Sequence, residues 1–470
     1  MSLGLFATMG IAARSLEAQQ AGIEVTGNNI ANVNNPAYAR QQLNLATTTS
    51  VNVGVGLEGT GVQAVSIQQV RSTLLDQQIT TEQGTSGYLS SQQSALQFAQ
   101  AALGEQISST TSSNAANASA SIAQGLSDLL NEFQNLSTQP TSMAERQILL
   151  QKASALAGQF NQVQQRLDTL HTNLNSSLQS DVGSANQLLS SIADLNDQIT
   201  NAQINTGSTP NGLIDLRQQK IEQLGNLVNI NTAAQPDGAV NITIGGVLMV
   251  SGKNMSDTLQ TYDAGGGQML VRATTAGTPL TLTGGTIAGT IDVRDGAVQT
   301  LSSNLDTLAS QLIDQVNSVH DNGFSLTGST GQPFFTGADA RTIAVNSTLL
   351  NNPALIQASG VSGAAGDNTV ALALGQLANA PQAGLNNQTF SQSYDQTVSA
   401  MGQSLSSVNG QLTDEQTVQQ MLQQQRSSVS GVSLDEEMTN LSTYQRAYQA
   451  SAHLLSIVDQ MLDTLVNNTR

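Results

Sequence analysis

The segment Gly54 to Gly59 (GVGLEG) matches the G-x-G-x-x-G pattern that holds the pyrophosphate of a dinucleotide. That chemistry needs a helix to begin directly after the glycines, because the free amides of its first turn bind the phosphates. Here the next residues, Thr60 to Val65 (TGVQAV), predict a strand. We therefore interpret the segment as a glycine-rich β excursion and expect no cofactor.

The three histidines could in principle hold a metal. His171, His320 and His453 are far apart in the sequence, and none lies in an H-E-x-x-H context. A zinc site therefore has little support, and we expect these side chains to lie at the surface or in helix seams.

The run Asp435-Glu436-Glu437 could provide carboxylates for acid-base or metal chemistry. It follows Ser433, and Ser433 with Glu436 has the S-x-x-E form of a capping box. Carboxylates in a first helical turn interact favourably with the helix dipole and the free amides, which explains them without a site. No nucleophile elbow or Walker A sequence occurs. We predict a protein that is not an enzyme and has no catalytic, cofactor or metal site.

Composition excludes several kinds of partner. The 470 residues include 33 acidic and 15 basic side chains, a formal charge of -18, so no nucleic-acid surface is expected. The absence of cysteine excludes disulfides and thiolate metal sites. No stretch reaches the roughly 18 apolar residues of a spanning helix, so no membrane insertion is expected. The apolar opening Leu3 to Ala13 has no basic segment before it, which predicts no cleaved signal peptide.

Helix-breaking residues outline the architecture. Six of the eight prolines lie between Pro210 and Pro381, so the middle third is turn-rich and both flanks are helical. The apolar periodicity and caps predict helical blocks at about 67–102, 142–205, 297–320 and 391–426, with a break near Gly183 left open. Strands are predicted over Gly238 to Met249, with a turn at Gly245-Gly246, over Met269 to Ala273 and within Thr281 to Val293. Residues 321–385 are expected to form loops and short helices.

The fold class predicted from these blocks is mainly α with a small β domain, in an elongated multi-domain protein. We expect residues 1–35 and 433–470 to form a terminal coiled-coil assembly domain. Residues 36–231 with 297–432 would form an elongated α-rich body, and residues 232–296 a small outer β domain.

Both ends of the chain carry apolar residues at seven-residue intervals, as in the seam of a coiled coil. The N-terminal seam consists of Met9, Leu16, Ile23 and Ile30, with Phe6 on its companion row. The C-terminal seam consists of Leu434, Leu441, Tyr448, Leu455 and Leu462, with Tyr444, Val458 and Leu465 on its companion row. Packing of both stripes into the main core is one interpretation. We favour pairing of the two end helices with each other and with neighbouring subunits.

Motifs beside these seams resemble those of the bacterial flagellar rod, hook and hook-associated proteins. The N-terminal motif is NNIANVN followed by PAYARQ, and it includes Asn28, Asn29, Asn32, Tyr38, Arg40 and Gln41. The C-terminal motif is SLDEEMTNL followed by YQRAYQA, within residues 433–450. Asparagine side chains bond the local backbone, so this run is also expected to end the first helix before Pro36. Ala37 stands where the family usually has glycine, which argues against a positive φ there.

The resemblance implies a structural subunit of the flagellum, at the junction between hook and filament, that assembles through its terminal helices. The partners it implies are a ring of copies of itself, the hook protein, a second junction protein next to the filament, and an export chaperone at the C-terminal helix. It also implies an extracellular location after export without signal cleavage. The alternatives are a rod or hook subunit and a secreted adhesin; a fused muramidase would need a carboxylate pair in a cleft.

Overall fold

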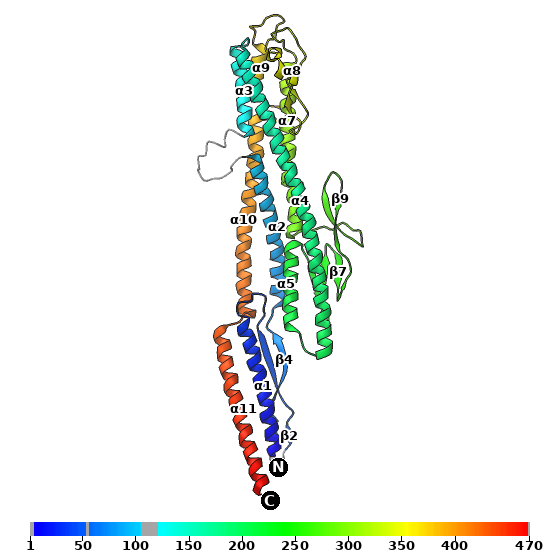
Figure 1. Ribbon diagram of the computed structural model, residues 1–470, viewed down its shortest axis with the longest axis vertical. Helices are drawn as coiled ribbons and strands as arrows, with labels where there is room; N and C mark the ends of the chain where they lie inside the picture. The colour runs from blue at the N-terminus through cyan, green and yellow to red at the C-terminus, as the bar shows by residue number, and fades with distance from the viewer. Residues whose placement is uncertain (1–3, 53–55, 105–120, 469–470) are drawn as a thin grey trace.

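The computed structural model describes residues 4–52, 56–104 and 121–468, and it is elongated and mainly helical (Figure 1). A terminal domain with both chain ends lies at one end, and a long helical body extends from it to a loop-rich tip. The predicted fold class is confirmed. The helices are α1 (Leu5–Ala31), α2 (Thr73–Leu103), α3 (Ile122–Thr138), α4 (Met143–Thr206), α5 (Asn211–Leu227), α6 (Gly285–Val293), α7 (Gln299–His320), α8 (Ser347–Asn351), α9 (Thr369–Gln376), α10 (Phe390–Ser430) and α11 (Leu434–Asn468).

Helix α4 is the backbone of the body. It begins where the Oγ atom of Ser142 accepts a hydrogen bond from the amide of Glu145, and it ends at Gly207 in the left-handed conformation. Its 64 residues continue through Gly183 without a break, a length of about 95 Å at 1.5 Å per residue. The glycine is tolerated because the helix is held by packing along its whole length.

Two apolar cores hold the body together, and α4 belongs to both. The first half of α4, including Leu149, Leu156 and Phe160, packs with α2, α3, α7 and α10 in the larger core. The second half, including Leu189 and Ile192, packs with α5 and the outer strands in the other. The long helix therefore connects the tip to the outer β domain through continuous packing.

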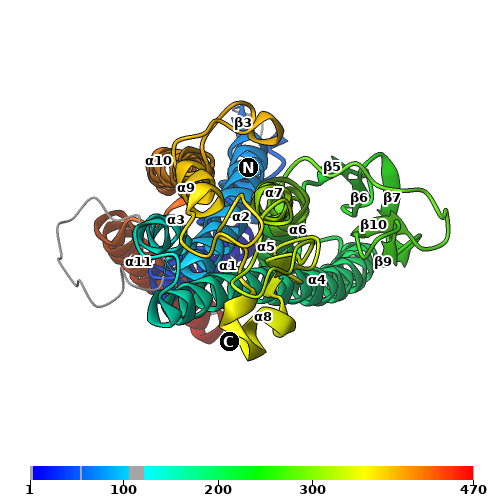
Figure 2. The same cartoon turned by 90° about the horizontal axis from the view of Figure 1, so that it is seen from above.

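The outer β domain lies to one side of α4 (Figure 2). Its antiparallel sheet has the order β5 (Asn231–Ala234), β6 (Val240–Ile244), β7 (Val247–Ser251) and β8 (Asn254–Met255), and β9 (Leu259–Asp263) pairs with β10 (Met269–Ala273). The predicted strand pair around Gly245-Gly246 is confirmed. Both glycines have positive φ, 54° and 84°, as a two-residue hairpin turn requires.

The prediction of β structure within Thr281 to Val293 was wrong for most of that run. Residues Gly285–Val293 form helix α6, which continues through a π-helical turn at Arg294–Val298 into α7. Gly289 lies so close to α2 that a Cβ atom there would be 2.3 Å from the carbonyl oxygen of Tyr88. A short apolar run buried on most sides lacks the polar face that distinguishes a helix from a strand. The π-helical turn between α6 and α7 also crosses the predicted domain boundary at 296.

The predicted helical block 67–102 also needs correction at its start. Residues up to Gln69 belong to strand β4 (Val62–Gln69), which pairs antiparallel with β1 (Gln41–Thr47), and α2 begins only after Ser72. Two short strands, β2 (Val51–Asn52) and β3 (Leu57–Glu58), pair beyond them. This hairpin packs against α1, so it lies with the terminal domain although its residues fall within the range predicted for the body. Helix α3 was not predicted at all.

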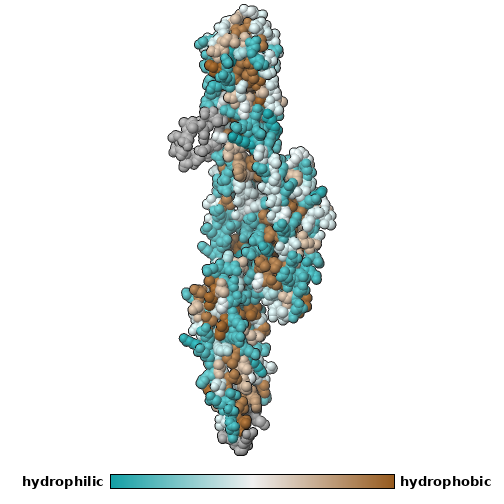
Figure 3. Space-filling view, in the orientation of Figure 1, coloured by the Kyte–Doolittle hydropathy of each residue, from teal (hydrophilic) through white to brown (hydrophobic). Residues whose placement is uncertain are grey.

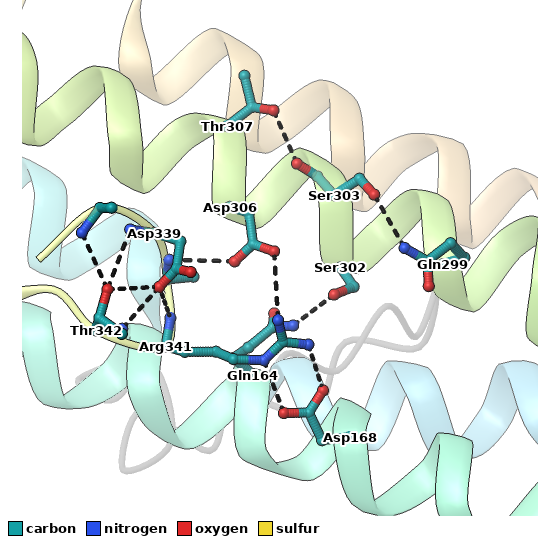
Figure 4. Close-up of polar contacts among 12 residues, drawn as sticks. Gln164, Asp168, Gln299, Ser302, Ser303, Asp306, Thr307, Asp339, Arg341 and Thr342 are labelled. Carbon is teal, nitrogen blue, oxygen red and sulfur yellow. Dashed lines mark hydrogen bonds and ion pairs between the residues drawn. The ribbon is translucent and has the colours of Figure 1, made fainter. Parts of the chain in front are cut away.

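The tip contains short elements, as expected for residues 321–385: β11 (Phe335–Thr336), β12 (Ala344–Val345), α8, α9 and two 3₁₀ turns, Pro353–Leu355 and Ala383–Leu385. Figure 4 shows how one of its loops is fixed. Arg341 forms a two-pronged ion pair with Asp168 of α4, at 2.6 and 2.9 Å, and Asp306 of α7 accepts a bond from the amide of Ala340. Gln164 donates to Ser302 beneath them. These charges fasten the loop to two helices.

The expectation that all three histidines lie at the surface or in seams was wrong for His320. Its side chain is fully buried at the end of α7. Nδ1 lies 2.7 Å from the carbonyl oxygen of Gln332, and Nε2 accepts a bond from the amide of Gln357. Burial lowers its pKa to about 4, and the nearby Arg146 lowers it further against the opposing bond to Gln332. The imidazole therefore forms hydrogen bonds with the backbone of two tip loops. The proximity of these loops was not predicted from the sequence.

Candidate assembly interface

Helices α1 and α11 lie side by side and antiparallel in the terminal domain (Figure 1). Three contacts fix their register: Asn29 donates to Glu437 (3.1 Å), Gly22 faces the ring of Tyr444, and the hydroxyls of Ser15 and Ser451 are 2.8 Å apart. We call these residues the inner rows, because both sets recur every seven residues. A Cβ atom on Gly22 would lie only 2.7 Å from the Tyr444 ring, so glycine allows the close approach of the two helices.

The seam residues predicted from the sequence lie beside the inner rows, and we call them the outer rows. On α1 they follow the inner row by one residue, about 100° further around the helix. None of the ten is buried, and Phe6 is 78 % and Leu434 49 % exposed. Apolar side chains also appear on the surface of this domain in Figure 3. Phe6, Met9, Leu434 and Tyr448 are exposed and the other six are half-buried, so another chain could cover the outer rows further. Their role in assembly stays a prediction. Their ten members are Phe6, Met9, Leu16, Ile23, Ile30, Leu434, Leu441, Tyr448, Leu455 and Leu462.

Asn29 is the centre of the joint between the terminal helices and the rest of the chain. Its side chain is 1 % exposed. Its Oδ1 accepts bonds from the hydroxyl of Tyr38 (2.8 Å) and the amide of Gln41 (2.9 Å). Its Nδ2 donates to the carbonyl of Gln41 (2.8 Å) and to Glu437 (3.1 Å). One amide thus holds α1, the first residue of β1 and the start of α11 together.

Arg40 and two carboxylates of the α11 N-terminus complete this joint. The Nε of Arg40 donates to Glu437 (2.7 Å), and its NH1 lies 2.9 Å from Glu436. The backbone amide of Arg40 donates to the carbonyl of Ser430 at the end of α10. Burial, followed by the negative charges of Asp215 and Glu437, raises the pKa of Tyr38 to about 12. Tyr38 therefore stays a neutral hydrogen-bond donor at physiological pH.

A second layer of ion pairs continues from the joint into the body. Arg71 lies 2.8 Å from Asp215 of α5 and 3.5 Å from Asp76 of α2. Arg426 of α10 lies 3.7 Å from Asp76 and 2.8 Å from Glu222. Burial raises the pKa of Asp215 to about 6 against the opposing effect of Arg71. Three helices of the body thus meet at charged groups directly behind the terminal domain.

The remaining motif residues shape the turn after α1. Helix α1 ends at Ala31, and the side-chain Nδ2 of Asn32 donates to the main-chain and side-chain oxygens of Asn28 at 2.9 and 3.0 Å. The expected helix stop before Pro36 is confirmed. Ala37 does not have a positive φ; in the part of the chain that the structure describes, only Asn386 and Asn387 do among non-glycine residues.

Sequence reasoning put the two ends of the chain in one domain but missed the contacts between their motifs. Glu437 was assigned to the helix dipole, and it does lie in the first turn of α11. The structure also buries it against Arg40 and Asn29. The only available signal was that both motifs contain charged or amide residues in otherwise charge-poor ends. The inner row of α1 was missed because glycine and serine do not register in an apolar pattern, whereas Tyr444 of the α11 inner row was placed on the predicted companion row.

The glycine-rich segment and the histidines were the groups considered first for chemistry. Gly54 lies outside the described residues, and the segment after Gly59 leads into strand β4, as predicted. His453 is exposed and His171 half-buried. Within the three described ranges, no group of three or more histidine or acidic side chains could hold a metal ion. No helix over the same ranges is long and apolar enough to cross a membrane.

Two family descriptions match the chain. Residues 105–335 match "Flagellar hook-associated protein FlgK helical domain", and residues 423–468 match the C-terminal domain of the flagellar basal body rod FlgEFG proteins. Flagellar hook-associated protein 1 of Bacillus subtilis is 28 % identical over 98 % of both chains. The protein of the same name from Salmonella typhimurium is 24 % identical over 96 % of this chain and 98 % of its own. The chain is thus similar over nearly its whole length to flagellar hook-associated protein 1 of other bacteria.

A solved structure has the same fold. The flagellar hook junction protein FlgK from Burkholderia pseudomallei matches with a TM-score of 0.62 at 16 % identity, covering 75 % of this chain and all of that one. The rod-protein match covers α11 and the end of α10, including Glu436 and Glu437. The resemblance predicted from the two end motifs is thereby confirmed over nearly the whole chain.

Proposed function

We propose that this protein is a structural subunit of the bacterial flagellum that joins the hook to the filament. The similarity supports this role, since the relatives are hook-associated proteins. The observation that carries the mechanism is the position of the outer rows, in which four apolar heptad residues are exposed and six are only half-buried along the two terminal helices. Exposed apolar surface of this kind marks an interaction site. The protein works by assembly, without catalysis.

The joint around Asn29 gives the subunit a fixed geometry between its terminal helices and its body. It fixes the direction of the helix pair relative to the body through hydrogen bonds and ion pairs from four segments of the chain. Repeated subunits stack in a regular ring only when each holds the same geometry. We therefore assign the terminal helices, together with the β1–β4 hairpin, to assembly, and the body and outer β domain to the exterior.

The proposed partners are copies of this chain in a ring, the hook protein on one side and a second junction protein on the filament side. An export chaperone would cover the apolar rows of α11 before assembly, because no neighbouring subunit covers them at that stage. The proposed location is extracellular, after export without cleavage of a signal.

Leu455→Asp tests this proposal in a motile bacterium whose own copy is replaced by the variant. Leu455 is the fourth member of the α11 outer row and is half-buried. Burial of a leucine contributes about 1.5 to 3 kcal/mol, and burial of an unpaired carboxylate costs more. We expect hooks without filaments and release of filament protein to the medium, with the melting temperature of the purified monomer almost unchanged.

Ser456→Asp is the matched control, because Ser456 is exposed and lies outside both rows. This variant should build normal filaments. Normal filaments from Leu455→Asp, or equal failure of both variants, would show that the outer rows are not the assembly surface. Electron microscopy with an antibody against the body would place the protein on the flagellum and test the junction itself.

A further inference from the structure

The β1–β4 hairpin has an exposed apolar face of its own. Leu45, Val65 and Ile67 are 42, 59 and 39 % exposed. Leu43 pairs with Ile67 and Leu45 pairs with Ala64, and the register shifts between Asn44 and Leu45, so Val65 lies in a β-bulge between these two pairs. Only Leu43 is buried. Neither strand contains a charged residue. We call Leu45, Val65 and Ile67 the hairpin face.

The hairpin face and the outer rows belong to the same domain but are separate surfaces. Helix α1 packs against α11 and against the hairpin, and in Figure 1 it lies between them. On α1, Ile11 contacts Gly61 and Arg14 donates to the carbonyl of Thr60, so these positions face the hairpin. The outer row of α1 uses other positions. One subunit therefore presents two apolar, uncharged surfaces that it cannot bring together itself.

A ring of more than two identical subunits needs two such surfaces. Each subunit must use one patch toward one neighbour and a different patch toward the other, because a patch that binds its own copy closes at a dimer. The hairpin face is the shorter of the two surfaces: Val65 to Ile67 span about 7 Å of strand, and the outer row from Phe6 to Ile30 spans about 35 Å of helix. The absence of charge in both surfaces allows either to be desolvated at little cost.

We infer that the hairpin face of one subunit packs on the outer rows of the next, and that this contact closes the ring. The inference rests on the proposed self-assembly and assigns its two surfaces. The occupant of the hairpin face is thus a second copy of this chain. A contact of the hairpin face with another flagellar protein, or with the hairpin of a second copy, would give different results in the following test.

The cysteine-free sequence makes chemical crosslinking clean. The doubly substituted chain Val65→Cys with Tyr448→Cys is expressed in place of the native copy, and isolated flagella are treated with a short bis-maleimide. Every subunit then carries one thiol on each proposed surface, so the crosslinked product should be a ladder of oligomers. Each single variant should remain monomeric. A second pair, Val65→Cys with Met9→Cys, samples the outer row of α1.

The control is Gln68→Cys with Tyr448→Cys. Gln68 is exposed and follows Ile67 in the regular part of β4, so its side chain points to the face opposite that of Ile67, and its ladder should be lost. Val65→Asp, alone in the chain, should abolish filament formation, whereas Gln68→Asp should not.

Three outcomes would overturn the inference. One is the absence of a ladder from both Val65 pairs although the protein is present in the flagella, and another is a dimer from Val65→Cys alone. The third is normal filaments from Val65→Asp. Absence of the unmodified protein from flagella would instead overturn the proposed function, so the two failures are distinguishable.

Discussion

The body and the terminal domain are both built from long helices, but they place their apolar residues oppositely. In the body, Phe133, Phe160 and most leucines of α4 face inward and are buried. In the terminal domain, α1 and α11 meet through Gly22, Ser15 and Asn29, while the outer rows remain at the surface. The body therefore has the means to fold by itself. The terminal helices keep most of their apolar surface for contacts that a single subunit cannot provide.

Replacement of one phenylalanine by alanine in each region should give the largest difference in the free energy of unfolding. Phe160→Ala removes a fully buried ring from the larger core and should lower the free energy of unfolding by about 3 to 5 kcal/mol. Phe6→Ala removes a ring that is 78 % exposed and should change it by less than about 0.5 kcal/mol. Chemical denaturation of the purified monomer measures both. A similar loss for the two variants would mean that the terminal domain is already buried in the monomer.

Acid should act on the tip of the body before it acts on the helix pair. Because the pKa of His320 is lowered to about 4 in the folded protein, the unfolded state binds its proton first as the pH falls below about 6.5. The stability that the neutral imidazole contributes is present above pH 6.5 and is lost progressively down to pH 4. The expected loss is roughly 3 kcal/mol.

His320→Gln isolates this effect from the titration of the carboxylates. The difference in unfolding free energy between wild type and variant should shrink as the pH is lowered from 7 to 4. His453→Gln, at an exposed position of the terminal domain, is the matched control for the substitution itself. A constant difference for His320→Gln across this range would contradict the assigned burial of its neutral form.

Removal of the Asn29 side chain should loosen the terminal domain while sparing the body. Asn29→Ala leaves Tyr38, Glu437 and both main-chain groups of Gln41 without this partner, a local cost of about 2 kcal/mol. Hydrogen exchange should accelerate in α1 and α11 and stay unchanged in α4. Asn28→Ala is the control, because Asn28 is exposed. Equal rates of hydrogen exchange in the two variants would mean that Asn29 is not the centre of the joint.

The sequence was informative wherever one helix face is apolar or a cap is explicit. Ser142 and the heptads of α4 defined a helix that the structure contains almost to the residue. The run from Gly285 to Val293 was misassigned because its environment is apolar on most sides, and periodicity is then silent. The contacts of Arg40 and His320 depend on segments far away in the chain. No local pattern encodes such partners.

Gly22 shows the same limit within a single helix. Its importance arises from the ring of Tyr444, more than 400 residues later, and not from any property of its neighbours. Heptad analysis identified apolar positions of both end helices, including Tyr444, but gave no sign that a glycine and a serine of α1 would lie at the contact. Pattern recognition therefore found the domain and missed its internal contact.

The two chain ends lie together at the far extremity of the terminal domain (Figure 1). This position has a practical consequence for labelling experiments. An affinity tag or fluorescent protein fused at either end would sit where the subunits are proposed to converge, and the label itself would obstruct assembly. The turn at Gly265 to Gly267, between β9 and β10, is exposed and belongs to the outer β domain. A short epitope inserted there would report on the protein in living cells from the outside of the structure.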